Sequence, residues 1–311
     1  MFTPSRLRSL IPLLLAAQTC TAIGAEPPPI LTADSLRQYV ETFNRHDHTH
    51  FGQAISNEDT ADWMAENIPR FECPDPESEE IYHFRWWTYR KHIKEMADGF
   101  VVTEFLPAVN WSGKHNTISC PAGHHFREGR WIRDPRYLDD YAVFWFRKGG
   151  SPRRYSFWAA DSIHQLALTR GDFSLAIDLL PDLIANDRAW EESRLEPSGL
   201  FWQIDDRDGM EVSVGGAGYR GQGVRPTINS YTFGDAMAIA DIAERAGKPD
   251  IAEAYRTKAE RIRKLVLEHL WDPEDQFFKV LPRNEGAEWV DVRELHGYTV
   301  GLVLPKYQNH R

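Results

Sequence analysis

The chain has 311 residues, of which 42% are hydrophobic and 26% are charged. This is the composition of an ordinary globular protein and excludes a disordered or fibrous one. The formal net charge is -10, and because phosphate binding needs a basic face, the charge argues against nucleic acid as the main partner. A neutral or cationic ligand fits this balance better.

The first 25 residues have the three parts of a secretory signal. Arg6 and Arg8 form a positive start, Leu10 to Ala17 is a short apolar run, and Ala22 to Ala25 offers small residues for cleavage. The apolar run is too short for a stable membrane anchor. We therefore expect an exported protein, periplasmic or secreted, that is not membrane-bound after cleavage; the alternative is a buried N-terminal helix.

Three cysteines limit the disulfide chemistry. Cys20 would leave with the signal, so Cys73 and Cys120 remain. An oxidising compartment permits them to pair, but a disulfide also requires a short distance that the sequence does not supply. A bridge and two separate buried thiols both stay open.

The chain after the signal begins with a leader, residues 26–70. Prolines at 27–29 indicate a linker, and short helices are expected at residues 34–45 and 59–67, each opened by an Asp. Residues 82–96 form an aromatic-rich helical pattern. Residues 101–105 are the best strand candidate, and a Gly-, Asn- and His-rich loop is expected to continue to Arg130.

Helical patterns then follow one another closely. They cover residues 135–147, residues 155–169 with Gly171 as a stop, a helix capped by Asp172, residues 231–246, and a helix that begins at Pro249. Residues 231–246 are almost continuously apolar, which is typical of a buried helix, whereas the helix from Pro249 has one apolar stripe, which is typical of an outer helix.

Inner-then-outer helical hairpins joined by short turns build concentric helical toroids. The sequence therefore predicts an all-α chain of the (α/α)6 toroid type with a small β-containing loop insertion. Only about three to four hairpins are recognisable, where a closed toroid needs six. We expect residues 71–311 to be a partial toroid domain whose C-terminal part is missing.

An acidic segment near the middle of the chain carries the main candidate chemistry. Residues 196–225 place Asp208 and Glu211 beside Phe201 and Trp202, between glycines. Carboxylates against aromatic rings suit glycosidic cleavage, in which one carboxylic acid protonates the leaving oxygen and a second carboxylate activates water or attacks. The alternative is a solvated acidic turn.

Other kinds of site find little support. Cys120, His124 and His125 form one short cluster with no second pair at zinc spacing, so a hydrogen-bonded loop is the better interpretation than a metal centre. The chain has no phosphate loop, dinucleotide fingerprint or nucleophile-elbow serine. We expect no metal and no cofactor.

Three motifs resemble a known group of glycosidases. Residues 209–213 (Gly-Met-Glu-Val-Ser) are similar to the Gly-(Trp/Met)-Asp-X-Ser stretch of trehalase, processing α-glucosidase I and mannosylglycerate hydrolase. The resemblance implies that Glu211 is the catalytic acid, an Asp-to-Glu departure that leaves Asp208 as a rival. Residues 157–162 resemble the Trp-Asp-Ser segment on an inner helix of that group, and residues 225–231 resemble its segment ending in Leu-Asn.

The start of the domain, residues 71–74 and 82–92, looks like the mannosylglycerate-hydrolase-like branch of the same superfamily. The resemblance thus covers roughly residue 71 to the end. The sugar-binding residues that we infer from these motifs and from the acidic segment are Asp161, Trp158, Trp202, Asn229, Arg85 and Trp87. Each has a structural alternative: Asp161 as a helix cap, Arg85 as an ion-pair partner, and at least one of the tryptophans as plain core.

The resemblance implies a glycoside hydrolase that acts on a terminal sugar by acid–base catalysis with inversion. It also implies a second carboxylate beyond Arg311, so we expect this polypeptide to be weak or inactive by itself. The competing hypotheses are a carbohydrate-binding remnant that has lost hydrolysis, and a helical scaffold with no role in sugar binding. The expected partner is an oligosaccharide or polysaccharide-derived substrate.

Overall fold

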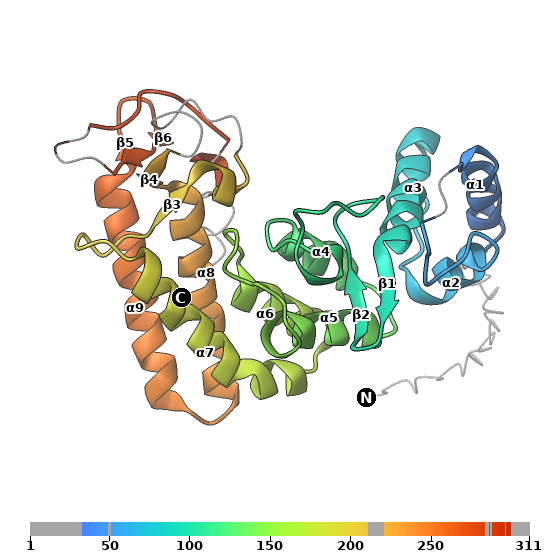
Figure 1. Ribbon diagram of the computed structural model, residues 1–311, viewed down its shortest axis with the longest axis horizontal. Helices are drawn as coiled ribbons and strands as arrows, with labels where there is room; N and C mark the ends of the chain where they lie inside the picture. Colours follow the sequence, from blue (N-terminus) through green and yellow to red (C-terminus); the bar gives the residue numbers. More distant parts are fainter. Residues whose placement is uncertain are drawn as a thin grey trace, which may run out of the picture.

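The computed structural model describes residues 33–48, 51–210, 221–283, 286, 288–295 and 297–299. Helices dominate this part of the chain (Figure 1). The α-helices are α1 (Ala33–His46), α2 (Thr60–Asn67), α3 (Pro76–His92), α4 (Ala122–Gly129), α5 (Arg136–Arg147), α6 (Ala159–Arg170), α7 (Ser174–Arg194), α8 (Pro226–Arg245) and α9 (Pro249–His269). Two 3-10 turns, η1 (Lys114–Asn116) and η2 (Asp205–Asp208), and short strands occupy the connections.

The predicted inner and outer helices are confirmed in the second half of the chain. Helix α8 is buried on nearly all sides and packs against α6, α7 and α9, and α8 and α9 lie side by side (Figure 1). Helix α9 buries a single stripe formed by Ala252, Ala259, Ile262 and Val266. A helix that is apolar all round needs neighbours on every side, whereas an amphipathic helix needs a partner on one side only.

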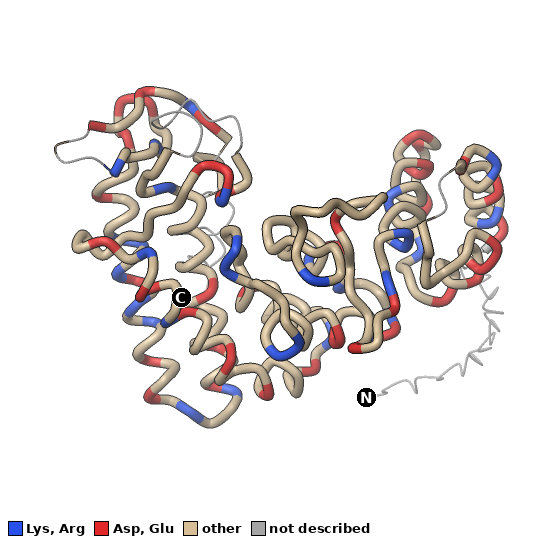
Figure 2. The backbone as a smooth tube through the Cα atoms, viewed as in Figure 1, with Lys and Arg blue, Asp and Glu red and all other residues tan. Residues whose placement is uncertain are grey.

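The first half of the described chain packs onto the same hydrophobic core. Helices α1 and α2 lie against α3 at the end of the molecule opposite α8 and α9 (Figure 1). The buried ammonium of Lys91 in α3 binds the carboxylate of Asp47 at 2.7 Å, which joins α3 to the segment after α1. Acidic and basic residues are interspersed along both halves (Figure 2).

The helix expected at residues 82–96 has different boundaries. It begins at Pro76, because Asp75 accepts a hydrogen bond from the backbone N–H of Glu77 and proline suits the first helical position. It ends at His92, where the chain turns into strand β1 (Ile93–Met96), which pairs with β2 (Gly99–Val102). A two-residue turn, Ala97-Asp98, closes this hairpin, and Gly99 begins β2 with a φ of 112°. The strand predicted at residues 101–105 thus begins and ends earlier.

The loop expected up to Arg130 is also corrected, because residues 122–129 form helix α4 and residues 114–116 form η1. Two other helices begin at different residues than predicted. Residues 155–158 are not helical, so α6 begins at Ala159, whereas Pro226 starts α8 five residues before the predicted Tyr231. The earlier start of α8 brings one further turn of polar side chains to the site described below.

A small sheet covers one end of α8. Strand β3 (Trp202–Ile204) pairs with β4 (Gln222–Val224), which pairs with β7 (Leu281–Pro282). Strand β5 (Trp271–Asp272) pairs with β6 (Phe277–Phe278) next to it. Directly after β3, the carboxylate of Asp205 forms a completely buried ion pair with Arg225 at the start of α8. This contact connects turn η2 to the start of α8. Removing one partner would leave a buried charge uncompensated, which is strongly destabilising.

Cys73 and Cys120 are not joined by a disulfide in this structure, and the Cys73 thiol lies 3.0 Å from the backbone carbonyl of Asp75. In the part of the chain that the structure describes, no helix is both long enough and apolar enough to cross a membrane.

The N-cap of α7 is Phe173 rather than the predicted Asp172, but the Asp172 side chain still bonds to the first residue of this helix. The Asp172 carboxylate accepts hydrogen bonds from the backbone N–H of Ser174 at 2.9 Å and from the Ser174 hydroxyl at 2.7 Å, at the start of α7. We expect Asp172→Ala to lower the free energy of unfolding, because the backbone N–H of Ser174 at the start of α7 loses its acceptor. Urea unfolding of this variant, with the exposed Glu253→Ala in α9 as control, measures the loss; equal stabilities of the two variants would contradict it.

Candidate functional site

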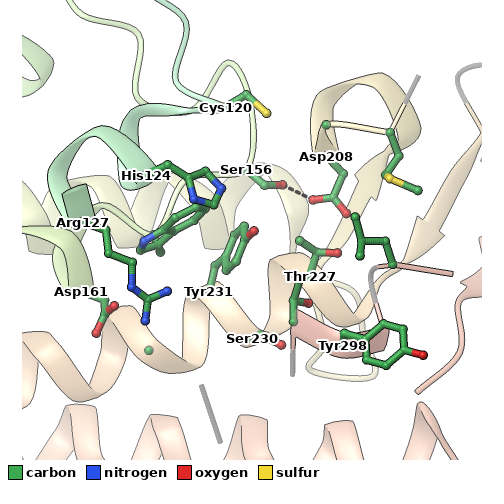
Figure 3. A pocket seen from close by; sticks show the side chains of 16 residues that line it. Cys120, His124, Arg127, Ser156, Asp161, Asp208, Thr227, Ser230, Tyr231 and Tyr298 are labelled. Carbon is green, nitrogen blue, oxygen red and sulfur yellow. Dashed lines mark hydrogen bonds between the residues drawn. The ribbon is translucent and has the colours of Figure 1, made fainter. Parts of the chain in front are cut away.

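A cavity of about 350 Å³ lies between α4, the N-terminal ends of α6 and α8, and turn η2. This volume falls within the range of small-molecule binding sites. Figure 3 shows side chains from these elements pointing into a common space. The sequence-predicted residues Trp158, Asp161 and Asp208 line it, together with Cys120, His124, Arg127, Ser156, Gly209, Met210, Thr227, Ser230, Tyr231, Gly234, Leu295, Tyr298 and Thr299.

Helix α8 contributes one polar or small stripe to the wall of the cavity. Thr227, Ser230, Tyr231 and Gly234 follow the i, i+3, i+4, i+7 spacing that places residues on one helix face. The other faces of α8 carry apolar residues that pack against neighbouring helices. This polar stripe lies where the cavity interrupts the packing of the helix against its neighbours.

Asp208 enters the cavity at the end of turn η2. Gly209 ends this turn with a φ of 79°, a left-handed conformation that glycine adopts without strain. An added Cβ at Gly209 would also lie 2.9 Å from the Cys120 sulfur, so a larger residue does not fit there. The Asp208 side chain is 7% exposed and accepts a hydrogen bond of 2.5 Å from the hydroxyl of Ser156 (Figure 3).

Asp161 lies on the opposite side of the cavity, in the first turn of α6 (Figure 3). Its backbone N–H donates to the carboxylate of Asp235 in α8 at 2.9 Å. Asp235 therefore satisfies a backbone donor that the helix itself leaves without an acceptor. Burial raises the pKa of Asp235 well above its usual value, and the charges of Asp161 and Asp187 act in the same direction.

Aromatic rings form the wall between the two carboxylates. The ring centroids of Trp158 and Tyr231 lie 4.4 Å apart, and His124 contacts Trp158 edge-on at 4.7 Å. Gly123 permits this arrangement, because an added Cβ would lie 2.1 Å from the Trp158 ring. Burial, and secondly the charge of Asp208, raise the pKa of the Tyr231 hydroxyl, which keeps it protonated as a hydrogen-bond donor.

Two predicted sugar-binding residues near this region do not line the cavity. The Asn229 side chain donates to the backbone carbonyls of Phe201 and Arg225, at 2.8 Å each, and accepts from the N–H of Phe201. Its amide therefore holds the segment before β3 against α8. Trp202 in β3 packs under the guanidinium groups of Arg194 and Arg283, at 4.2 and 4.0 Å from its ring centroid.

The two remaining predicted residues, in α3, are also outside the cavity. Trp87 belongs to the core between α1 and α3, where its indole N–H donates to Asn44 at 2.9 Å and its ring stacks on Phe84. Arg85 is largely exposed and forms an ion pair with Glu128 of α4. The spacing of residues along α3 does not show whether Trp87 or Arg85 faces a cavity. The packing of α3 on α1 and α4 decides which face of the helix does so.

The predicted acid Glu211 lies outside the described residues, so its role stays a prediction. Met210, the residue before it, lines the cavity. Residues that the sequence reasoning missed include Ser156, Tyr231 and His124. The spacing of Thr227, Ser230 and Tyr231 within an apolar segment was a usable signal for the α8 wall, whereas the contact between Ser156 and Asp208 spans 52 residues and has no local signature.

A family model and several solved structures are similar to this chain. Residues 114–305 match the family model described as "Mannosylglycerate hydrolase MGH1-like glycoside hydrolase domain". A solved structure titled "Sialidase" superposes with a TM-score of 0.83 at 38% identity, over 88% of this chain and 25% of that chain. A rhamnosidase from Klebsiella oxytoca with rhamnose bound gives a TM-score of 0.48 at 14% identity, over 68% of this chain and 42% of that one.

A GH63 mannosylglycerate hydrolase from Thermus thermophilus, in complex with Tris and D-glycerate, gives a TM-score of 0.41 at 14% identity, over 85% of this chain and 72% of that one. The present chain spans about a quarter of the length of the sialidase. The family match and the sialidase superposition confirm the predicted resemblance to mannosylglycerate-hydrolase-like glycosidases and the all-α (α/α)6 fold class.

The raised pKa of Asp235 predicts a pH-dependent stability difference. Folding raises this pKa, so its stabilising effect is complete below the unfolded value near 3.8 and is lost as the pH rises through the folded value. Asp235→Asn retains an oxygen that accepts the Asp161 N–H but has no proton to lose. We therefore expect the free energy of unfolding of this variant, relative to wild type, to increase from pH 4.5 to pH 8 in urea titrations. A difference that is constant over this range, or that decreases, would contradict the assignment.

Proposed function

Because the chain belongs to the mannosylglycerate hydrolase MGH1-like glycoside hydrolase family, we propose that its cavity binds a terminal sugar and contributes to hydrolysis of the O-glycosidic bond by acid–base catalysis. The proposal includes inversion by a single displacement, in which acid and base lie about 6.5–9.5 Å apart to admit a water molecule. The proposed substrate is an oligosaccharide or a polysaccharide-derived glycan, and nucleic acid and membrane are not proposed partners.

The observation that carries this proposal is the placement of two carboxylates on either side of an aromatic wall. Asp208 and Asp161 line the same cavity, Tyr231 lies between them (Figure 3), and the Trp158 ring contacts Tyr231 at 4.4 Å. Aromatic faces suit the apolar C–H surface of a sugar ring, while carboxylates suit its hydroxyls. We assign sugar-hydroxyl binding to Asp161 and contact with the ring to Trp158.

The proton donor is assigned to the segment formed by η2 and the residues after it. Asp208 lies within this cavity, and Glu211 follows it by three residues, so the acid is proposed to be one of these two carboxyls. The Ser156 hydroxyl donates to one Asp208 oxygen, which orients the carboxyl group. If Asp208 is the acid, its second oxygen carries the proton to the leaving oxygen. The base is not assigned to a residue of this chain.

Substitution of the two carboxyls tests this assignment on the full-length protein. Hydrolysis is measured on p-nitrophenyl monosaccharides and matching oligosaccharides that end in glucose, mannose, galactose or rhamnose. We expect Glu211→Gln or Asp208→Asn to reduce kcat about 10²- to 10⁴-fold, the usual contribution of a general acid. Asp206→Asn, on the same turn but outside the cavity lining, is the control and should retain activity.

The outcomes separate the candidate acids and the alternative function. Loss of turnover in Asp208→Asn but not in Glu211→Gln would make Asp208 the acid and reject the motif-based assignment. Sugar binding without turnover in wild type would replace hydrolysis with the carbohydrate-binding alternative. If neither variant differs from Asp206→Asn in an active enzyme, the proposed acid segment is wrong.

Export is the second part of the proposal. The positive start, the apolar run and the small residues before position 26 support cleavage of a secretory signal. We expect residues 1–30 fused to alkaline phosphatase to produce phosphatase activity outside the bacterial cytoplasm, since this reporter requires export to form its disulfides. Replacing Leu13 and Leu14 with arginine should abolish that activity; unchanged reporter activity would contradict the signal assignment.

A further inference from the structure

A second cavity, of about 500 Å³, lies against the adjoining face of helix α4, next to the proposed active site. Helix α3, strand β2 and the loop after it complete its wall, and α4 lies between α3 and α6 in Figure 1. Besides His124 and Tyr89, the polar side chains that line it are Arg85, Thr88, His92, Glu104, His125 and Glu128. None of these last six lines the first cavity.

Helix α4 joins the two cavities through a shared residue. Pro121, His124, His125 and Glu128 face the second cavity and follow the spacing of one helix face. His124 also lines the first cavity, where its ring contacts Trp158 at 4.7 Å. A ligand that occupies the first cavity therefore lies next to a side chain that borders the second.

The lining of the second cavity is polar, and its guanidinium group is paired with a carboxylate. Arg85 forms an ion pair with Glu128, and the imidazole of His125 lies 3.5 Å from the carboxylate of Glu104. Desolvation lowers the pKa of both His92 and His124, which favours their neutral forms at neutral pH. Such a surface offers many hydrogen-bond donors and acceptors and little net charge.

This chemistry suits a neutral, hydroxyl-rich ligand better than an anion or a metal ion. An anion would need an excess of positive charge, which the pairing of Arg85 with Glu128 removes. Among the described residues, the group of side chains close enough to hold a metal ion is Asp272, Asp275 and Asp291, not this cavity. The ammonium of Lys279 already binds all three of those carboxylates.

We propose that the second cavity is a subsite for the next unit of the glycan whose terminal sugar occupies the first cavity. The proposal rests on the proposed function, because it extends the same substrate past His124, which borders both cavities. Arg85 and Thr88 are its specificity-determining residues: they bind hydroxyls of the second unit and have no contact with the scissile bond. Arg85 is thus a sugar-binding residue, as its motif implied, but at a different position along the glycan.

Binding of a short and a long probe to the full-length protein tests the subsite. The probes are a p-nitrophenyl monosaccharide and a trisaccharide with the same terminal sugar, taken from the glucose, mannose, galactose and rhamnose series, and Kd is measured by calorimetry. We expect wild type to bind the trisaccharide more tightly. Arg85→Ala and the space-filling Thr88→Trp should each raise its Kd about tenfold and leave the Kd of the monosaccharide within about twofold.

Arg37→Ala is the matched control, because Arg37 and Asp62 form an exposed ion pair between α1 and α2 that resembles the exposed pair of Arg85 and Glu128. It should alter neither Kd. Equal affinity of wild type for the two probes, or equal weakening of both probes by the α3 variants, would overturn the subsite. The Asp208 and Glu211 variants test the proposed acid separately through kcat, so either inference can fail while the other holds.

Discussion

The wall that helix α8 contributes to the cavity depends on the burial of this helix. This helix packs against α6, α7 and α9 and turns one stripe, from Thr227 to Gly234, toward the cavity. A helix held on its other faces cannot rotate that stripe away without exposing apolar surface. The cavity is therefore a consequence of core packing rather than of loop conformation.

Two buried carboxylates connect α8 to the elements that carry the candidate chemistry. Asp235 accepts the backbone N–H of Asp161 and so holds the first turn of α6, while Asp205 binds Arg225 and holds turn η2. Such contacts contribute modest net stability, because both partners lose their hydration. Their importance lies in geometry, since they set the positions of Asp161 and Asp208 relative to the aromatic wall.

The two cavities give α4 an unexpected role. The glycine-rich segment before Arg130 forms a helix whose residue 123 must be glycine to admit the Trp158 ring. The same helix presents His124 to both cavities. With the proposed subsite, variation along α3 and α4 would change the recognised glycan without altering the residues proposed to lie beside the scissile bond.

Sequence by itself determined the helical class, the distinction between α8 and α9, and the region of candidate chemistry around Asp208. These follow from hydrophobic periodicity and short motifs, which depend on residues close together in the chain. Sequence also identified Asp161 and Trp158, because residues 157–162 resemble the Trp-Asp-Ser segment of the related glycosidases. The sequence did not predict the helix starts at Ala159 and Pro226 correctly, since they depend on local backbone conformation.

Only the tertiary structure decided which motif residues meet. Trp87, Trp202 and Asn229 are of the residue types that bind sugars, yet the first packs in the core, the second packs under two guanidinium groups and the third binds backbone. Ser156 and Tyr231 join Asp208 from distant segments. Contacts between segments far apart in the chain depend on how the helices pack, which residue type and spacing along one helix do not encode.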